Sequence, residues 1–205
     1  MALYALRDLL VSPREFFESR RPESLTFPAL GAIVLVAVIT AGGLWAVMQL
    51  AVVDLPPEGR RAFRRVFGTV LVVLPFVMLV SWAILAGVVY LLVRGDATEA
   101  TYSGTFGVVG LAALLEIPAT IIGFVRAYML FASVSFSDPE TAQRQLEAAA
   151  SGEDPLVLLV WIGVTLWKGY VWREGLLGAY DLPSDRATLA AGVAVGFSLL
   201  MVLFG

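Results

Sequence analysis

Long runs of apolar residues constrain this chain more than any other feature of its sequence. Residues 28–50 contain no charged side chain, and about 20 such residues suffice for an α-helix to cross the roughly 30 Å of hydrocarbon in a bilayer. Comparable runs, one of which contains a single glutamate and another a single lysine, cover approximately residues 66–93, 102–124, 155–172 and 187–204. Because a backbone in lipid must satisfy its hydrogen bonds internally, we predict an all-α fold: a polytopic membrane helix bundle of five transmembrane helices joined by short polar loops.

The composition agrees with lipid as the main solvent of the chain. Only 15% of the residues are charged, whereas a soluble domain carries roughly 25%. The 14 basic and 17 acidic residues are spread among tails and loops, so there is no basic stripe and nucleic acid is not an expected partner. No polar stretch is long enough for a second, soluble domain. We therefore expect one transmembrane domain over residues 25–205, preceded by interfacial helices over residues 1–24.

The chain contains neither His nor Cys. The lack of Cys removes thiolate nucleophiles and thiolate metal ligands, and the lack of His removes the usual base at neutral pH. Zincin motifs and a Ser–His dyad are therefore excluded. The one lysine, Lys168, lies near the end of the fourth run, where a lysine usually snorkels to the interface. We predict no catalytic residue, no cofactor and no metal site.

The first 24 residues predict two short helices at the membrane surface. Leucines recur at helical spacing over residues 3–10, with charges between them, as in a helix that lies on a surface. Ser12 then opens a capping box that closes three residues later. Phe16 and Phe17 follow, and we predict that they rest against the membrane or the bundle; a sensor of lipid or of a partner is the alternative. A further short polar helix is predicted before the fourth span, over residues 139–149.

A carboxylate, Glu116, interrupts the third run, close to Pro118 and ten residues before Arg126. A charge at membrane depth costs several kcal/mol unless it is paired. The apolar segment continues to residue 136 and is too long for one straight crossing. It is therefore predicted to break, with the crossing over residues 102–124 and the remainder continuing along the interface or into the next loop. Three interpretations of Glu116 remain open: an ion pair with Arg126 or Lys168, a neutral acid bonded to backbone that Pro118 frees, and a proton- or ion-linked transport site.

We expect Glu116 to face the interior of the bundle and to bond to neighbouring polar groups or backbone. Arg126 lies about 15 Å further along an ideal helix, and Lys168, near the far end of the fourth run, is no easier a partner. The substitution Glu116→Gln is accordingly expected to leave folding and stability nearly intact.

The last run contains a GxxxG step formed by Gly192 and Gly196. This spacing lets two helices approach closely. Packing inside one bundle is its commoner use, and the seam of a homodimer is the alternative.

The distribution of arginines indicates how the bundle is oriented. Cytoplasmic loops collect positive charge, and a cytoplasmic amino terminus places on that side Arg7, Arg14, Arg20, Arg21, Arg94, Arg173 and Arg186. The opposite side then holds Arg60, Arg61, Arg64, Arg65 and Arg144. We predict a multi-pass protein of the cell membrane with its amino terminus in the cytoplasm and its carboxyl terminus outside.

Several local strings occur along the chain in a characteristic order. They are Ser12-Pro13-Arg14-Glu15-Phe16-Phe17, then Tyr102-Ser103-Gly104-Thr105-Phe106 leading to Glu116-Ile117-Pro118, and finally Trp161, Gly175, Leu176, Ser184 and Ala187 before the last apolar helix. Their order and spacing resemble the Yip family, in particular its prokaryotic branch. These membrane proteins are named for interacting with Ypt/Rab-type GTPases in eukaryotes, and the resemblance covers most of the chain.

The resemblance implies a five-helix bundle with a cytosolic amino terminus and no catalytic residue. In eukaryotic members it implies roles in membrane traffic, organelle shape and recruitment of prenylated GTPases. Those relatives usually carry a longer amino-terminal region, whereas here only about two short helices precede the bundle, so GTPase binding is not carried over. The excess of arginine over lysine, 13 to 1, and the pI near 5.0 are typical of a GC-rich, salt-adapted (halophilic) prokaryote.

We therefore expect a non-enzymatic integral membrane protein that acts through contacts with membrane lipids, other membrane proteins or a second copy of itself, in membrane organisation. The alternative is a small-solute or ion/proton-linked carrier that uses Glu116.

Overall fold

A computed structural model describes residues 2–53, 57–97, 99–133, 144 and 155–204 of the 205-residue chain. Within these ranges every regular element is a helix. The elements are α1 (Ala2–Val11), α2 (Pro13–Glu18), the 3₁₀ helix η1 (Pro22–Leu25), α3 (Thr26–Val53), α4 (Pro57–Val93), α5 (Tyr102–Leu111), the 3₁₀ helix η2 (Ala112–Leu115), α6 (Glu116–Ser133), α8 (Pro155–Tyr180) and α9 (Ser184–Phe204).

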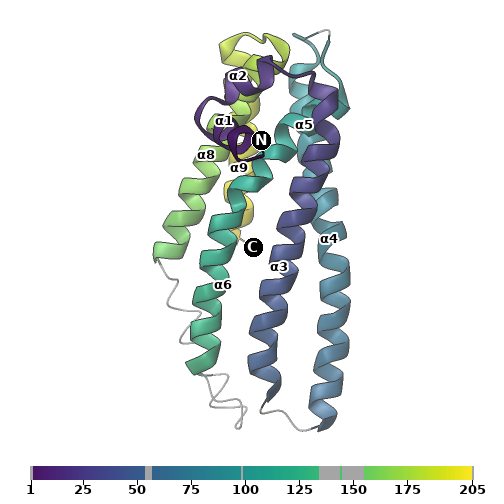
Figure 1. The fold of residues 1–205 in the computed structure, drawn as a ribbon, viewed down its shortest axis with the longest axis vertical. Helices are drawn as coiled ribbons and strands as arrows, with labels where there is room; N and C mark the ends of the chain where they lie inside the picture. The colour runs from purple at the N-terminus through teal and green to yellow at the C-terminus, as the bar shows by residue number, and fades with distance from the viewer. Residues whose placement is uncertain (1, 54–56, 98, 134–143, 145–154, 205) are drawn as a thin grey trace.

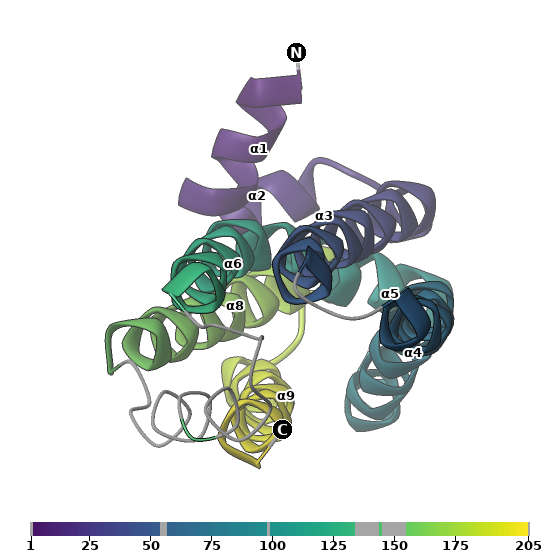
Figure 2. The same ribbon diagram turned by 90° about the horizontal axis from the view of Figure 1, so that it is seen from below.

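The long helices run side by side along the long axis of the molecule (Figure 1). The short helices α1 and α2 lie at one end, together with the start of α5, the end of α8 and the start of α9; we call this the N-terminal end of the bundle. Seen along the axis, α1 projects sideways from the bundle (Figure 2).

In the part of the chain that the structure describes, four helical segments are long and apolar enough to cross a membrane: η1 with α3, α4, α5 with α6, and α8. The prediction of an all-α membrane bundle is confirmed. A fifth crossing by α9, which has 21 residues and starts at the N-terminal end, stays a prediction.

The outward faces of the long helices are apolar. Val38, Val72, Phe76 and Leu159 each expose at least 60% of their surface. Valine and phenylalanine at such positions would be costly in water, whereas lipid solvates them, and a helix that is apolar all round is typical of a membrane span. Burial inside the protein is therefore concentrated in a smaller part of the bundle.

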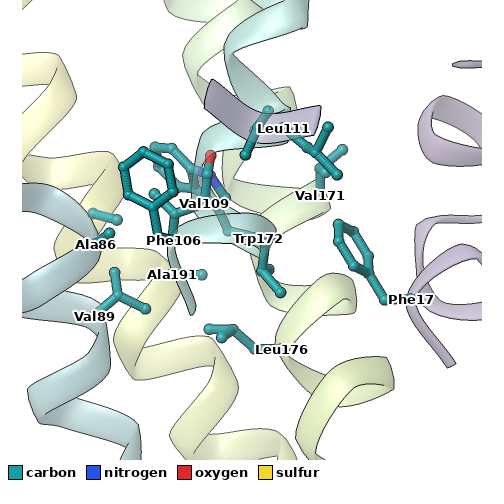
Figure 3. Packing of buried hydrophobic residues seen from close by; sticks show 14 of the residues in the cluster. Phe17, Ala86, Val89, Phe106, Val109, Leu111, Val171, Trp172, Leu176 and Ala191 are labelled. Atoms are coloured by element: carbon teal, nitrogen blue, oxygen red, sulfur yellow. The ribbon is translucent and has the colours of Figure 1, made fainter. Parts of the chain in front are cut away.

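The core lies toward the N-terminal end, where α2, α4, α5, α8 and α9 converge (Figure 3). The indole of Trp172 in α8 is fully buried, and its Nε1 donates a hydrogen bond of 3.1 Å to the carbonyl oxygen of Val109 in α5. Phe17 enters the same cluster from α2. Since the core includes α2, the short N-terminal helices are packed against the bundle.

Glycines allow the closest approaches in this core. A Cβ added to Gly107 of α5 would lie 2.9 Å from the Cβ of Leu25 and 2.9 Å from the carbonyl oxygen of Pro22. A Cβ added to Gly178 of α8 would collide with the backbone carbonyl of Arg14 in α2. Small residues thus let α5 pack on η1, and α2 on α8, at backbone distance, which is how membrane helices gain packing energy where lipid gives little hydrophobic driving force.

One expectation about helix ends needs correction. Helix α2 begins at Pro13, but Ser12 makes no side-chain capping bond. Its amide instead donates to the carbonyl of Asp8 at 2.9 Å and so completes the last turn of α1, which leaves Ser12 with φ −131° and ψ 58° rather than the extended geometry of a cap. The helix predicted over residues 139–149 stays a prediction, because residue 144 is the only part of it among the described residues.

The third run is interrupted near Pro118 by η2, which precedes Glu116. A proline ring clashes with the carbonyl four residues earlier, here in η2, and this explains the tightened turn. Pro118 is only the third residue of α6, where an amide has no intrahelical partner in any case. The helix therefore continues to Ser133 (Figure 1), and the prediction that the remainder turns along the interface or into a loop is wrong.

Candidate intramembrane polar site

An ion pair joins Glu116 and Lys168 inside the bundle. Glu116 is the first residue of α6, and Lys168 lies in α8; the Nζ of Lys168 donates to the Oε1 of Glu116 over 2.6 Å. Lys168 is 4% exposed, and the Glu116 side chain is 15% exposed. The interpretation of Glu116 as half of a buried pair with Lys168 therefore matches the geometry, and the expectation that this lysine is a difficult partner is wrong.

Lys168 also does not snorkel to the interface. The helix that carries it, Pro155–Tyr180, ends eight residues beyond the predicted end of the span at residue 172. Lys168 thus lies 13 residues from the start of α8 and 12 from its end, or about 20 Å and about 18 Å along the axis at 1.5 Å per residue. The pair therefore lies near the middle of α8 and of the apolar segment Tyr102–Ala132, and a charge is most costly at the centre of a bilayer.

Two tryptophans line the ammonium of Lys168. Its Nζ lies 5.5 Å from the ring centroid of Trp82 in α4 and 5.6 Å from that of Trp172 in α8. The two indoles meet edge to face, with centroids 6.3 Å apart. Cation–π attraction is worth about 0.5–2 kcal/mol per ring and is strongest where water is excluded. Together with the carboxylate, the indoles offset part of the cost of removing Lys168 from water.

Trp82 was not expected at the site from sequence reasoning. Its helix, α4, is apolar on all sides within the span, so the sequence contains no signal for which tryptophan faces a lysine on another helix.

Two cavities adjoin the ion pair. One, of about 350 Å³, lies between Glu116 and residues of α3 and α6, which include Thr40 and Thr120. The other, of about 320 Å³, is lined by both Glu116 and Lys168 together with residues of α4 and α9. Met78, Glu116 and Trp161 line both. A third cavity, of about 370 Å³ between α3 and α6, has no charged residue in its lining.

The other residues singled out near Glu116 lie away from its carboxylate. Pro118 lies in the first turn of α6. Arg126 is ten residues further along the same continuous helix, about 15 Å away, and it does not pair with Glu116. Of the four residues predicted for an intramembrane polar site, the structure thus brings only Glu116 and Lys168 into contact.

Phe16 and Phe17 lie in the core at the N-terminal end, with 7% and 1% of their surface exposed. A Cβ added to Gly175 of α8 would lie 2.9 Å from the ring of Phe17, which shows how closely α2 packs on α8. The guanidinium of Arg20 stacks 3.9 Å from the ring centroid of Phe16. Both phenylalanines face the bundle, which is one of the two positions considered for them.

The GxxxG step of α9 is not a contact within the bundle. A Cβ added to Gly192 or Gly196 would meet no described atom within 4 Å. Helix α9 instead buries a stripe of alanines, Ala187, Ala190, Ala191 and Ala194. The expectation that the step packs inside one bundle is therefore wrong for the described residues, and the homodimer seam stays a prediction.

Comparison with known proteins gives one match. A family model described as the Yip1 domain matches residues 7–205. No curated protein and no solved structure matches the chain.

Proposed function

Because this chain belongs to the Yip1 domain family, we propose that it is a non-enzymatic multi-pass membrane protein that acts through contacts with lipids or other membrane proteins in membrane organisation. The family match covers nearly the whole chain, so the proposal concerns the entire bundle. We also propose a cytoplasmic amino terminus, an outside carboxyl terminus and an interfacial role for residues 1–24.

The observation that favours a contact function is the mutual neutralisation of the site's charges. Lys168 is 4% exposed, donates to Glu116 at 2.6 Å and lies against two indole rings. A carrier needs a charged group that exchanges partners during transport, whereas a pair held between packed helices fixes α6 against α8. A fixed pair of this kind suits a scaffold whose outer surface does the work.

The surface available for contacts is the outward face of α4. Phe76 and Val72 on this face are 66% and 65% exposed, whereas Val89 of the same helix is fully buried. This contrast within one helix supplies a matched pair of positions for an experiment.

A photo-crosslinking amino acid placed at position 76 in native membranes tests the proposal, with the same amino acid at position 89 as the control. We expect discrete protein or lipid adducts from position 76 and only intramolecular products from position 89. The proposal fails if neither crosslinking nor purification in mild detergent yields a specific lipid or protein.

The second candidate function is a carrier that uses Glu116, favoured by the two cavities that adjoin its carboxylate. A carrier must bind its cargo, and cargo that binds the folded state raises thermal stability. A screen of small solutes and ions for stabilisation of the purified protein, followed by flux measurements in vesicles with the wild type and Glu116→Gln, separates this candidate from the contact function.

A further inference from the structure

We propose that the two cavities beside the ion pair bind a neutral, mostly apolar lipid that ends in a hydroxyl group, with this hydroxyl placed between Glu116 and Lys168. The inference adds a ligand to the proposed function and does not depend on it, because a chain that organises membranes through protein partners would bind such a molecule equally well. It rests on the charge, hydrogen-bonding capacity, depth and shape of the site.

The charge of the site favours a neutral ligand. Glu116 and Lys168 together carry no net charge, wherever the shared proton resides, and no other charged residue lines either cavity. A cationic or anionic ligand would add an uncompensated charge at membrane depth, at a cost of several kcal/mol. A neutral molecule avoids this cost.

The pair retains unused hydrogen-bonding capacity. Lys168 has three N–H donors, and one of them is engaged by Oε1 of Glu116. The second carboxylate oxygen, Oε2, makes no hydrogen bond with any described residue. A hydroxyl is the smallest group that donates to Oε2 and accepts from Nζ at the same time, whereas an ether or a carbonyl only accepts.

A second polar group on α8 is buried without a partner. The Oγ1 of Thr165 has no hydrogen bond among the described residues, and the residue is fully buried. Thr165 lies three residues before Lys168 and hence on the same side of α8. Buried hydroxyls are normally satisfied, so α8 carries an unsatisfied hydroxyl one turn before Lys168, although Thr165 itself lines neither cavity.

Depth and shape favour a lipid that dissolves in the hydrocarbon over a phospholipid head group. Glu116 lies 14 residues from the start and 16 from the end of the apolar segment Tyr102–Ala132, or about 21 Å and 24 Å at 1.5 Å per residue, while charged head groups stay at the surface of a hydrocarbon layer roughly 30 Å thick. The remaining walls are mostly apolar and aromatic, with Met78 and Trp161 shared by both cavities; their polar members are the hydroxyls of Thr40 and Thr120 in the first cavity and of Ser81 and Ser198 in the second. Phe197, which lines the second cavity, is 44% exposed, so this cavity reaches the lipid-facing surface from which such a molecule enters.

Tryptophan quenching by brominated probes tests the proposal on the full-length protein in phosphatidylcholine nanodiscs. The probes are 10-bromodecan-1-ol, its methyl ether and 1-bromodecane, which share the chain and differ only in the polar end. We expect saturable quenching by the alcohol, displaced by unbrominated decan-1-ol. The two hydrogen bonds to charged groups should make the apparent affinity about tenfold higher than that of the bromoalkane, with the ether in between.

Trp161 locates the bound probe. It lines both cavities, whereas Trp167, six residues further along the same helix, lines neither and is 49% exposed. The variant Trp161→Phe should lose most of the saturable quenching, and Trp167→Phe should retain it. Probes that bind in the uncharged third cavity, beside Gly43 and Tyr128, would cause quenching that is the same with and without the hydroxyl.

The double variant Glu116→Leu/Lys168→Leu removes the hydrogen-bonding groups and leaves the site neutral. We expect it to bind the alcohol and the bromoalkane with equal affinity. Equal, unsaturable quenching of the wild type by all three probes would overturn the proposal, and so would a decylammonium ion that displaces the alcohol more effectively than decan-1-ol does. The three-probe comparison uses the wild type and stays decisive if the double variant does not fold. A failure of position 76 to crosslink any specific protein or lipid would count against the proposed function and leaves this three-probe comparison unaffected.

Discussion

Removing one member of the Glu116–Lys168 pair should destabilise the protein more than any other single change outside the core. At 2.6 Å between Nζ and Oε1, the Coulomb attraction is about 6 kcal/mol for an effective dielectric constant of 20, which is an upper bound because the desolvation of Lys168 opposes it. The variant Glu116→Leu leaves a buried ammonium without its carboxylate, and such changes cost about 3–5 kcal/mol. We expect a loss in that range.

The conservative variant Glu116→Gln should cost less but not nothing. The amide oxygen can still accept from Lys168, and a hydrogen bond to a charged group is worth about 1.5–3 kcal/mol. Subtracting this retained bond from the cost of the leucine variant leaves an expected loss of about 1.5–2 kcal/mol. This revises the expectation from sequence that the glutamine variant is nearly neutral, which assumed that no cation lies at the carboxylate.

The double variant Glu116→Leu/Lys168→Leu removes both charges and shows whether the loss in the single variant comes from the unpaired ammonium. Replacing a buried ion pair by apolar residues of similar volume is often neutral or stabilising, so we expect it within about 1 kcal/mol of the wild type. Titration with SDS in mixed micelles, followed by tryptophan fluorescence, measures all three variants; the buried Trp172 reports on this region because its ring lies 5.6 Å from Nζ. Wild-type stability in Glu116→Leu, or a double variant no more stable than the single one, would refute the reasoning.

Four further predictions concern other parts of the bundle. Gly178→Ala places a methyl group against the backbone of α2 and should increase protease cleavage within residues 1–20, whereas Gly163→Ala, with no described atom within 4 Å of the added carbon, should not. Replacing both Phe16 and Phe17 by Asp should release the N-terminal helices while the spans stay folded; unchanged protease resistance of residues 1–20 would contradict this. Tyr180→Phe removes the hydroxyl that lies 3.3 Å from Oγ1 of Thr105 and 3.5 Å from the carbonyl oxygen of Thr101. It should lower the free energy of unfolding by about 0.5–1.5 kcal/mol, measured in the same SDS titration. Reporter fusions should place the amino terminus in the cytoplasm and the carboxyl terminus outside, and both ends on one side would exclude an odd number of crossings.

The spans could be predicted from sequence because lipid imposes a simple rule on them. A run such as residues 28–50 must form a helix wherever it enters hydrocarbon, since its backbone has no other hydrogen-bond partner there, and the observed α3 (Thr26–Val53) contains the whole run. The ends were less predictable. Helix α8 continues past Arg173 and Glu174, which pair with each other, so the change from apolar to charged residues did not mark the end of the helix.

Of the two charged residues of the site, the sequence indicated the position of only one, again because helix ends are hard to locate from sequence. Glu116 is conspicuous in sequence because a carboxylate is rare at membrane depth, but the depth of Lys168 depends on where α8 ends. The contribution of Trp82 depends on how α4 faces α8, and that is a matter of tertiary packing between helices of nearly uniform hydrophobicity. The order of apolar residues along a uniformly hydrophobic helix does not show which of its sides packs against a neighbouring helix.

The length of α4 has a consequence for where in a cell this protein is stable. Its charge-free stretch, residues 66–93, comprises 28 of the helix's 37 residues and spans about 42 Å, well beyond the roughly 30 Å of an average hydrocarbon layer. The arginines at positions 60, 61, 64 and 65 occupy the turns just before this stretch, and their charges resist being drawn into lipid. The helix must therefore tilt steeply or thicken the bilayer around it, at a cost of a fraction of a kcal/mol for each ångström of mismatch. The mismatch is smallest in a thick bilayer, so the protein should concentrate in the thickest regions of its membrane.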